Sequence, residues 1–251
     1  MSCAAVAKAQ QTEGSSRVRY GKERSSMNIE ILHMIDGAKR AKGITVIIDV
    51  FRAFSVEAYF FAGGAKEIIP VGDMELAYKL KEKNPEFILA GERHGEILPG
   101  FDVGNSPFDV AKLDCQGKTV VHTTSAGTQG IANAVNADEI LGASLVNAKA
   151  TAMYIKSKNP ENVSLVCMGL EALSQTEEDN LCADYIKSIL VGTSIDMRTE
   201  VENLKYTSGA KFFDKAQNSV FPEEDFGMCT QVDKFDFVMK MTENGIMRKV
   251  D

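Results

Sequence analysis

The sequence lacks the features that mark several large classes of protein. Its 251 residues include no tryptophan, three histidines and five cysteines. The cysteines are odd in number, scattered and without a C-x-x-C pair, which argues against a disulfide framework or a zinc site. No apolar run is long enough to cross a bilayer. We therefore expect a cytoplasmic protein with reduced thiols and no membrane partner.

A surplus of positive charge is also missing. The chain has 28 Lys and Arg residues against 35 Asp and Glu residues, a net charge of -7 at pH 7. Proteins that bind nucleic acid need a basic face to neutralise phosphates. We therefore expect no nucleic-acid partner. A small anion stays open as a ligand, because a few arginines, backbone N–H groups and a cation suffice to bind it.

Several known catalytic signatures are absent. Phe51 stands two positions after Asp49, so the D-x-D pattern of haloacid dehalogenase-type phosphatases is not formed. No cysteine is followed by an arginine six positions later, and the chain has no G-x-S-x-G motif. The stretch QGKT at residues 116–119 lacks the earlier glycine of a nucleotide P-loop, because Lys112 occupies that position.

Residues 1–26 differ in character from the rest of the chain. They are polar, show no sustained periodicity and lack the apolar core of a signal peptide. We predict that they form a disordered or non-native leader and that Met27 is the functional start. Residues 27–251 are expected to form a single domain.

That domain alternates strand and helix patterns, as α/β folds do. The β-branched run ITVIIDV at residues 44–50 is typical of a buried strand. Strands are expected at residues 27–35, 44–50, 66–71, 87–91, 119–122, 139–141, 163–168 and 235–241. Helices are expected at residues 54–62, 73–83, 147–158 and 176–191, with another beginning near residue 127. The pattern predicts a three-layer α/β/α fold with a largely parallel or mixed sheet.

Polar side chains follow three of these strands where each strand ends. They are Asp49 and Arg52, Glu92 and Arg93, and Thr123, Thr124 and Ser125. In open α/β sheets the ligand crevice lies outside the carboxyl ends of the strands. Each Asp, Ser or Thr in this set could simply cap the next helix, and for Ser125 or Thr123 alone we favour that explanation. The three groups together favour a site.

Two kinds of ligand group recur in this set. The stretch HTTSAGTQG at residues 122–130 joins a strand to a helix through small residues, including Gly127 and Thr128, which is typical of an anion cradle. Carboxylates that suit a hard cation such as Mg²⁺ are Asp49, Glu92, Asp102, Glu178 and Asp179. The three histidines, His33, His94 and His122, are too scattered to indicate a transition-metal site.

Four motifs in this order resemble the 2-phosphosulfolactate phosphatase family. They are IDVFRAFS at residues 48–55, AGERHGEILPGFDVGNSP at residues 90–107, TTSAGT at residues 123–128 and GASLVN at residues 142–147. The likeness extends from about Met27 to FPEED at residues 221–225. It departs at Ser125-Ala126-Gly127, where many members have Asn-Gly after the two threonines.

The resemblance implies a three-layer α/β/α fold and a Mg²⁺-dependent hydrolase. Its substrate would be a small phosphorylated anion, 2-phosphosulfolactate, converted to sulfolactate and phosphate on the route to coenzyme M. In our interpretation the catalytic residues are Asp49, Glu92 and Arg52, and the metal ligands are Asp49, Glu92 and Asp102. Substrate-binding residues are expected to be Arg93, Asn105, Ser106, Thr123, Thr124, Ser125, Gly127 and Thr128.

Alternatives remain open at this point. The chain could be a Mg²⁺-dependent phosphatase of another small phosphorylated acid, or an anion-binding protein without catalysis. Asp49 could ligate the metal, attack phosphorus or cap the next helix, although it lies early for capping. A homodimer is the default expectation for assembly.

Overall fold

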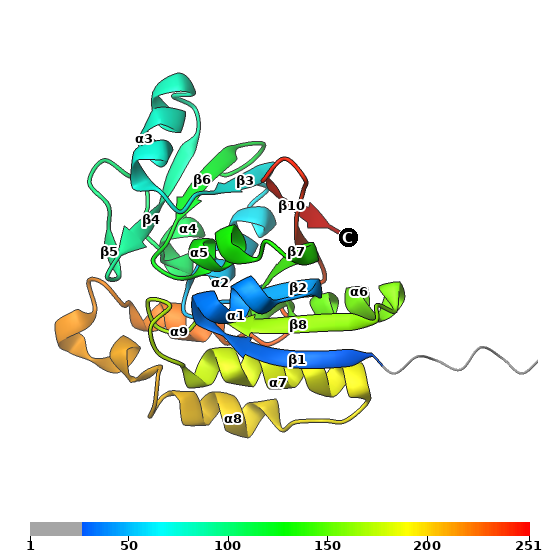
Figure 1. Cartoon of the computed structure of the whole chain (residues 1–251). Helices are drawn as coiled ribbons and strands as arrows, with labels where there is room; N and C mark the ends of the chain where they lie inside the picture. The colour runs from blue at the N-terminus through cyan, green and yellow to red at the C-terminus, as the bar shows by residue number, and fades with distance from the viewer. Residues whose placement is uncertain (1–26) are drawn as a thin grey trace, which may run out of the picture.

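The computed structural model describes residues 27–251, so the prediction for the leader lies outside the described residues. All ten strands of this part form one sheet, and helices cover both of its faces (Figure 1). The predicted three-layer α/β/α fold is therefore confirmed. No helix in residues 27–251 has the length and apolar character needed to span a membrane.

The elements follow the alternation predicted from the sequence. The strands are Asn28–His33 (β1), Gly43–Ile48 (β2), Glu67–Pro70 (β3), Ile88–Arg93 (β4), Glu96–Ile97 (β5), Thr119–Thr123 (β6), Ala137–Ala143 (β7), Asn162–Cys167 (β8), Val238–Met241 (β9) and Met247–Val250 (β10). The α-helices are Met34–Arg40 (α1), Ala53–Ala62 (α2), Met74–Lys83 (α3), Pro107–Val110 (α4), Gly127–Asn133 (α5), Ala148–Lys158 (α6), Glu177–Val191 (α7), Met197–Leu204 (α8) and Glu223–Cys229 (α9). Short 3₁₀ turns are Leu145–Asn147 (η1), Ala210–Phe213 (η2) and Lys215–Gln217 (η3).

The sheet is mixed, with the order β1-β8-β2-β7-β9-β10-β3-β6-β4-β5. The strands β1, β8, β2 and β7 form one parallel block, and β3, β6 and β4 form another. The hairpin of β9 and β10 lies between them and pairs antiparallel with both. The two parallel blocks therefore run in opposite directions along the ladder.

Strand β2 lies at the centre of the core because both of its faces are buried. Its Ile44, Val46 and Ile48 pack in the cluster that also contains buried residues of α6 and α7. Ile47 points to the opposite face and packs in the cluster that contains α2 and α5. This two-sided burial explains the nearly continuous apolar run that the sequence shows there.

Twist brings the carboxyl ends of the two blocks together. In a flat sheet, blocks of opposite direction would end at opposite edges. Neighbouring strands rotate by roughly 20–25°, and β2 and β6 are five positions apart. The strands β4 and β6 consequently run steeply across β1 and β8 (Figure 1). The chain just after β2 and the ends of β4 and β6 thus line one pocket.

The prediction missed the short strand β5, the helices α1, α4, α8 and α9, and the last strand β10. The expected strand at residues 27–35 ends at His33, and helix α1 follows at once. The expected last strand at residues 235–241 begins only at Val238, and the true last strand, β10, was not predicted. In β10 only Met247 is buried, so the strand has almost no apolar pattern to recognise.

A glycine sets how closely α5 lies on the sheet. A Cβ atom at Gly130 would lie 2.5 Å from Met168 Sδ and 2.6 Å from Ile47 Cγ2, both closer than side chains tolerate. We expect Gly130→Ala to lower the free energy of unfolding by about 1–3 kcal/mol, the usual cost of overpacking. Urea denaturation measures this change.

Gly227 in α9 is the matched control. A Cβ there would meet no heavy atom within 4 Å. Gly227→Ala should leave stability unchanged or raise it by about 0.5–1 kcal/mol, because glycine is costly inside a helix. A Gly130→Ala protein as stable as the wild type would show that this contact does not limit the packing of α5.

Candidate active site

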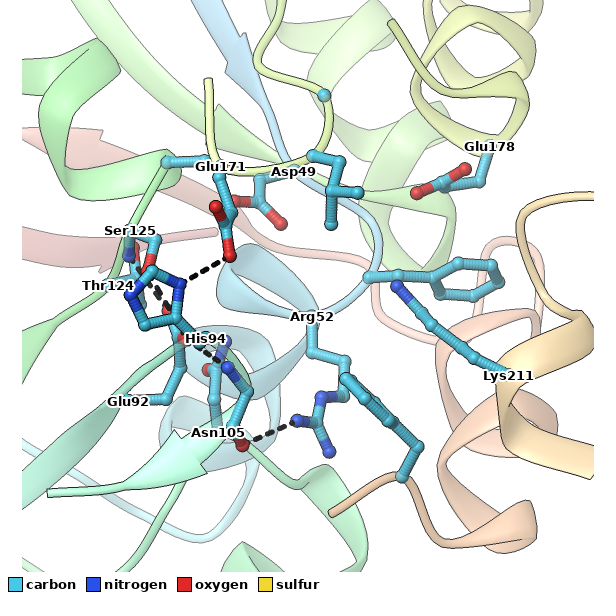
Figure 2. A pocket seen from close by; sticks show the side chains of 16 residues that line it. Asp49, Arg52, Glu92, His94, Asn105, Thr124, Ser125, Glu171, Glu178 and Lys211 are labelled. Carbon is cyan, nitrogen blue, oxygen red and sulfur yellow. Dashed lines mark hydrogen bonds and ion pairs between the residues drawn. The ribbon is translucent and has the colours of Figure 1, made fainter. Parts of the chain in front are cut away.

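One small pocket collects the charged side chains that lie beyond the strand ends. Its cavity volume is about 160 Å³, so it suits a compact ligand better than a nucleotide. Polar side chains that line it are Asp49, Arg52, Glu92, His94, Asn105, Thr124, Ser125, Glu171, Glu178 and Lys211 (Figure 2). The sequence prediction had brought together Asp49, Arg52, Glu92, Asn105, Thr124 and Ser125, and all six line this pocket.

Asp49 follows β2 directly and is buried, with 6 % of its surface exposed. Its Oδ1 accepts a hydrogen bond from the Ala53 backbone N–H at 3.1 Å. The expectation that Asp49 lies too early to reach helix α2 is therefore wrong. Burial raises the pKa of Asp49 to about 7, and the negative charges of Glu92 and Glu178 add to the effect. The hydrogen bond from Ala53 lowers the pKa only in part, so helix capping alone does not explain a buried carboxylate at position 49.

Glu92 ties two turns together at the end of β4. Its Oε1 accepts from the Ser125 N–H at 2.8 Å, and its Oε2 accepts from the Gly95 N–H at 2.7 Å. The side chain is buried, with 7 % exposed. Glu92 therefore fixes the β4–β5 turn against the β6–α5 turn.

Glu178 is the third buried carboxylate, and it lies in the first turn of α7. Burial raises its pKa, and its Oε2 has no hydrogen-bond partner among the described residues. Figure 2 shows Asp49, Glu92 and Glu178 on different sides of the pocket. The next residue, Asp179, instead accepts from the backbone N–H groups of Val50 and Gly169, both at 2.8 Å, and serves the structure.

Lys211 is a cation of this pocket that the sequence did not indicate. It enters from η2, on the same side as Glu178 in Figure 2. Burial lowers the pKa of its ammonium group, as does the positive charge of Arg52. None of the ion pairs within 4.0 Å among residues 27–251 includes Lys211, and its ammonium is thus available to an anion.

Arg52 is held rigidly by an acid from the distant helix α9. Its Nη1 donates to Asp225 Oδ2 and to the Val220 carbonyl, both at 2.8 Å. Asp225 is fully buried and also accepts from Ser106 Oγ at 2.8 Å. Ser106 therefore orients Asp225 instead of lining the pocket. A guanidinium group has five N–H donors, so Arg52 keeps some for a ligand.

Two residues missed by the sequence analysis lie at the pocket mouth. His94 Nδ1 and Glu171 Oε1 are 2.7 Å apart and join the β4–β5 turn to the loop after β8. This contact raises the pKa of His94. The side chain of His94 is 81 % exposed.

The structure does not bring Asp102 to the pocket. Its Oδ2 accepts from Lys81 Nζ at 2.9 Å and from the Leu89 N–H at 2.8 Å. Leu89 lies near the start of β4, whereas Glu92 lies near its end. The prediction that Asp102 shares a metal with Asp49 and Glu92 is therefore corrected.

Arg93 also points away from the pocket, because successive residues of a strand face opposite sides. Glu92 takes the pocket side, and Arg93 Nη2 donates to Thr123 Oγ1 at 2.9 Å. Its Nη1 donates to the Glu92 carbonyl at 2.6 Å. Neither Arg93 nor Thr123, both predicted to bind substrate, lines this pocket.

Several N–H groups of the predicted anion cradle already donate hydrogen bonds to side chains of the protein. The Thr124 N–H donates to Thr128 Oγ1, the Thr128 N–H donates to Thr124 Oγ1, and the Ser125 N–H donates to Glu92. Thr128 is buried and does not line the pocket. A Cβ atom at Gly127 would lie 3.0 Å from Asp49 Oδ2, so Gly127 leaves room for this carboxylate. The N–H groups of Thr124, Ser125 and Thr128 are therefore already engaged within the protein.

The carboxylates of the pocket fit a divalent cation that takes only one or two of its ligands from the protein. Within residues 27–251, no three His, Cys, Asp or Glu side chains cluster closely enough to bind a metal by themselves. Mg²⁺, however, is often held by one or two carboxylates together with waters and a substrate phosphate. Asp49 and Glu178 suit that mode, because both are buried acids and Glu178 has an unpartnered oxygen.

Comparisons with known proteins agree on one family. A model of the family described as 2-phosphosulpholactate phosphatase matches residues 29–244. A protein of Bacillus subtilis (strain 168) named as a probable 2-phosphosulfolactate phosphatase is 35% identical over 205 residues, which cover 80% of this chain and 88% of that protein. A protein of the same name from Caldanaerobacter subterraneus is 32% identical over 222 residues, covering 81% and 89%. Another, from Thermoplasma volcanium, is 29% identical and covers 86% and 99%.

The raised pKa of Asp49 predicts a stability effect with a definite sign. The folded protein keeps a proton on Asp49 up to about pH 7, whereas the unfolded chain loses it near the ordinary value of 3.8. Folding stability must therefore fall as the pH rises through this window. We expect metal-free Asp49→Asn to gain stability over the wild type between these pH values, by at most about 4 kcal/mol.

Urea unfolding in a chelating buffer at pH 4.5 and pH 8 measures this difference. Asparagine has the size of aspartate and keeps an oxygen for the Ala53 N–H. Equal stability differences between the two proteins at both pH values would contradict a buried, raised carboxyl at this position.

Proposed function

Because the chain belongs to the 2-phosphosulfolactate phosphatase family, we propose that it hydrolyses 2-phosphosulfolactate to sulfolactate and phosphate with the help of Mg²⁺. The observation that carries the proposal is the arrangement of the pocket. Buried carboxylates there face two cations, Arg52 and Lys211, in a small cavity. Sulfolactate formed in this way would serve the route to coenzyme M.

The substrate is a compact polyanion, and the pocket can neutralise it. 2-Phosphosulfolactate carries a phosphate, a carboxylate and a sulfonate. Arg52 offers a fork of N–H donors, Lys211 offers a point charge, and Asn105 offers an amide. A cavity of about 160 Å³ limits the ligand to a small molecule.

Asp49 and Glu178 are the residues that we propose to hold Mg²⁺, with Glu92 at the third side of the pocket. Bound Mg²⁺ would neutralise developing charge on the phosphoryl group and lower the pKa of a bound water. A nearby cation also stabilises the ionised form of Asp49, which burial otherwise disfavours. Metal ligation would thereby offset the cost of burying Asp49 and Glu178.

The protein's own side chains position the phosphoryl group. Asp225 holds the guanidinium of Arg52 at one wall, where its remaining N–H groups can stabilise equatorial oxygens. Glu92 holds the β4–β5 and β6–α5 turns in place around the pocket. Phe51 and Phe221 line the same cavity and reduce its access to water. Attack by Asp49 itself is the runner-up role, and the absence of a D-x-D partner disfavours it.

Two other functions are separated by specific observations. A non-catalytic anion-binding protein needs cations and N–H donors, and clustered carboxylates would oppose its ligand. A phosphatase for another small phosphorylated acid would use the same pocket. A panel of phosphate monoesters assayed with and without Mg²⁺ separates these cases, because only the proposed enzyme prefers 2-phosphosulfolactate.

We also propose a cytoplasmic location, which the thiols support. Cys115, Cys167, Cys182 and Cys229 are free and buried. The homodimer predicted from general frequencies stays a prediction.

Turnover should depend on the metal and on Asp49. Exhaustive chelation should abolish release of phosphate from 2-phosphosulfolactate, and Mg²⁺ should restore it. Asp49→Asn should fold yet lose at least roughly a hundredfold in kcat, the scale for removal of a key electrostatic group. A phosphate-release assay measures both effects.

Asp102→Asn is the matched control, because Asp102 pairs with Lys81 away from the pocket. Its kcat should stay within about threefold of the wild type, since an exposed ion pair contributes little. Full turnover by a protein with negligible metal content, or by a folded Asp49→Asn variant, would rule out the proposed role of this site.

A further inference from the structure

A chain of buried polar groups runs from helix α2 to the pocket wall. Glu57 on α2 and His122 on β6 are both fully buried, and Glu57 Oε1 lies 2.9 Å from His122 Nδ1. On the other side of the ring, His122 Nε2 lies 3.3 Å from Asn105 Oδ1. Asn105 lines the pocket beside Arg52 and Glu92 (Figure 2).

Burial of Glu57 and His122 in the core is unfavourable for the stability of the fold. Glu57 is the one charged residue of α2, and its neighbours in that helix are buried. Its second oxygen, Oε2, has no hydrogen-bond partner among the described residues. A buried acid–base pair of this kind is often less stabilising than apolar residues of similar volume. Stability therefore does not explain why Glu57 and His122 are present.

The hydrogen bond to Asn105 has a direction. An amide oxygen can only accept, so Nε2 of His122 must carry a proton. The proton between Nδ1 and Glu57 Oε1 can lie on either atom without changing this. With Oδ1 turned to the ring, the amide nitrogen of Asn105 is left for the pocket, and it makes no hydrogen bond to residues 27–251.

We propose that Glu57 and His122 are positioning residues that hold the amide of Asn105 with its N–H groups toward the bound anion. The amide then donates to an anionic oxygen in a pocket otherwise rich in carboxylates. If the amide turned over, its oxygen would face that anion and repel it. This inference rests on the proposed function for the identity of the substrate, but anion binding tests it separately.

The test removes the buried chain without leaving a charge in the core. The double variant Glu57→Leu/His122→Phe replaces the pair by apolar side chains of similar size, a change that proteins commonly tolerate. Asn105 then loses its fixed orientation. Inorganic phosphate is the probe, and calorimetry on the Mg²⁺-loaded protein should show binding weakened about tenfold or more. KM for 2-phosphosulfolactate should rise by a similar factor, with a smaller change in kcat.

Two further variants separate positioning from a merely structural role. His122→Gln keeps an N–H donor near the place of Nε2, so phosphate binding should stay close to that of the wild type. In an Asn105→Ala background, adding Glu57→Leu/His122→Phe should weaken phosphate binding no further, because the pair acts through Asn105. Thermal unfolding confirms that each variant is folded.

Several outcomes would overturn the inference. They are unchanged phosphate binding in the folded apolar variant, equal weakening in His122→Gln, and additive losses in the Asn105→Ala background. If the apolar variant does not fold, Glu57→Gln/His122→Phe takes its place, and the inference fails if this variant binds phosphate as tightly as His122→Gln does. A wild-type protein that binds phosphate but does not hydrolyse 2-phosphosulfolactate would contradict the proposed function and leave the positioning test intact.

Discussion

Three carboxylates share one buried pocket, and the rest of the site follows from the need to balance their charge. All three side chains are buried, and burial raises the pKa of Asp49 and of Glu178 because it disfavours their ionised forms. Hydrogen bonds, nearby cations, a metal or protonation can offset that cost. The charge of Lys211 and the Ala53 N–H offset part of it for Asp49, and a divalent cation would offset more. The same burial of carboxylates that lowers stability without a metal would suit the pocket to a divalent cation and a phosphorylated anion.

The fold creates this concentration of charge by twisting a mixed sheet. Asp49 comes from one parallel block and Glu92 from the other, and these blocks run in opposite directions. Twist and the close approach of α5 bring their ends together, with Gly127 leaving room for Asp49. A long-range contact then fixes one wall of the pocket, because Asp225 of helix α9 holds the guanidinium of Arg52. Rigid walls matter because misplaced charges lose most of their value in catalysis.

The sequence predicted those site residues that follow a recognisable strand pattern. Asp49 and Glu92 were found because each follows an apolar strand. Asp102 was misassigned because spacing in a loop does not tell which end of β4 the side chain reaches. Lys211 was missed because it stands in an irregular segment with no periodic pattern, and only the tertiary fold brings it to the pocket.

A divalent cation that binds in the carboxylate pocket must displace the proton of Asp49. Calorimetric titration of the metal-free protein with Mg²⁺ at pH 6, in two buffers of different ionisation enthalpy, counts the protons released on binding. With the pKa of Asp49 at about 7, we expect release of close to one proton per bound metal. The Asp49→Asn variant should release far less. Binding of Mg²⁺ without proton release, or no binding at all, would show that Asp49 does not hold the metal.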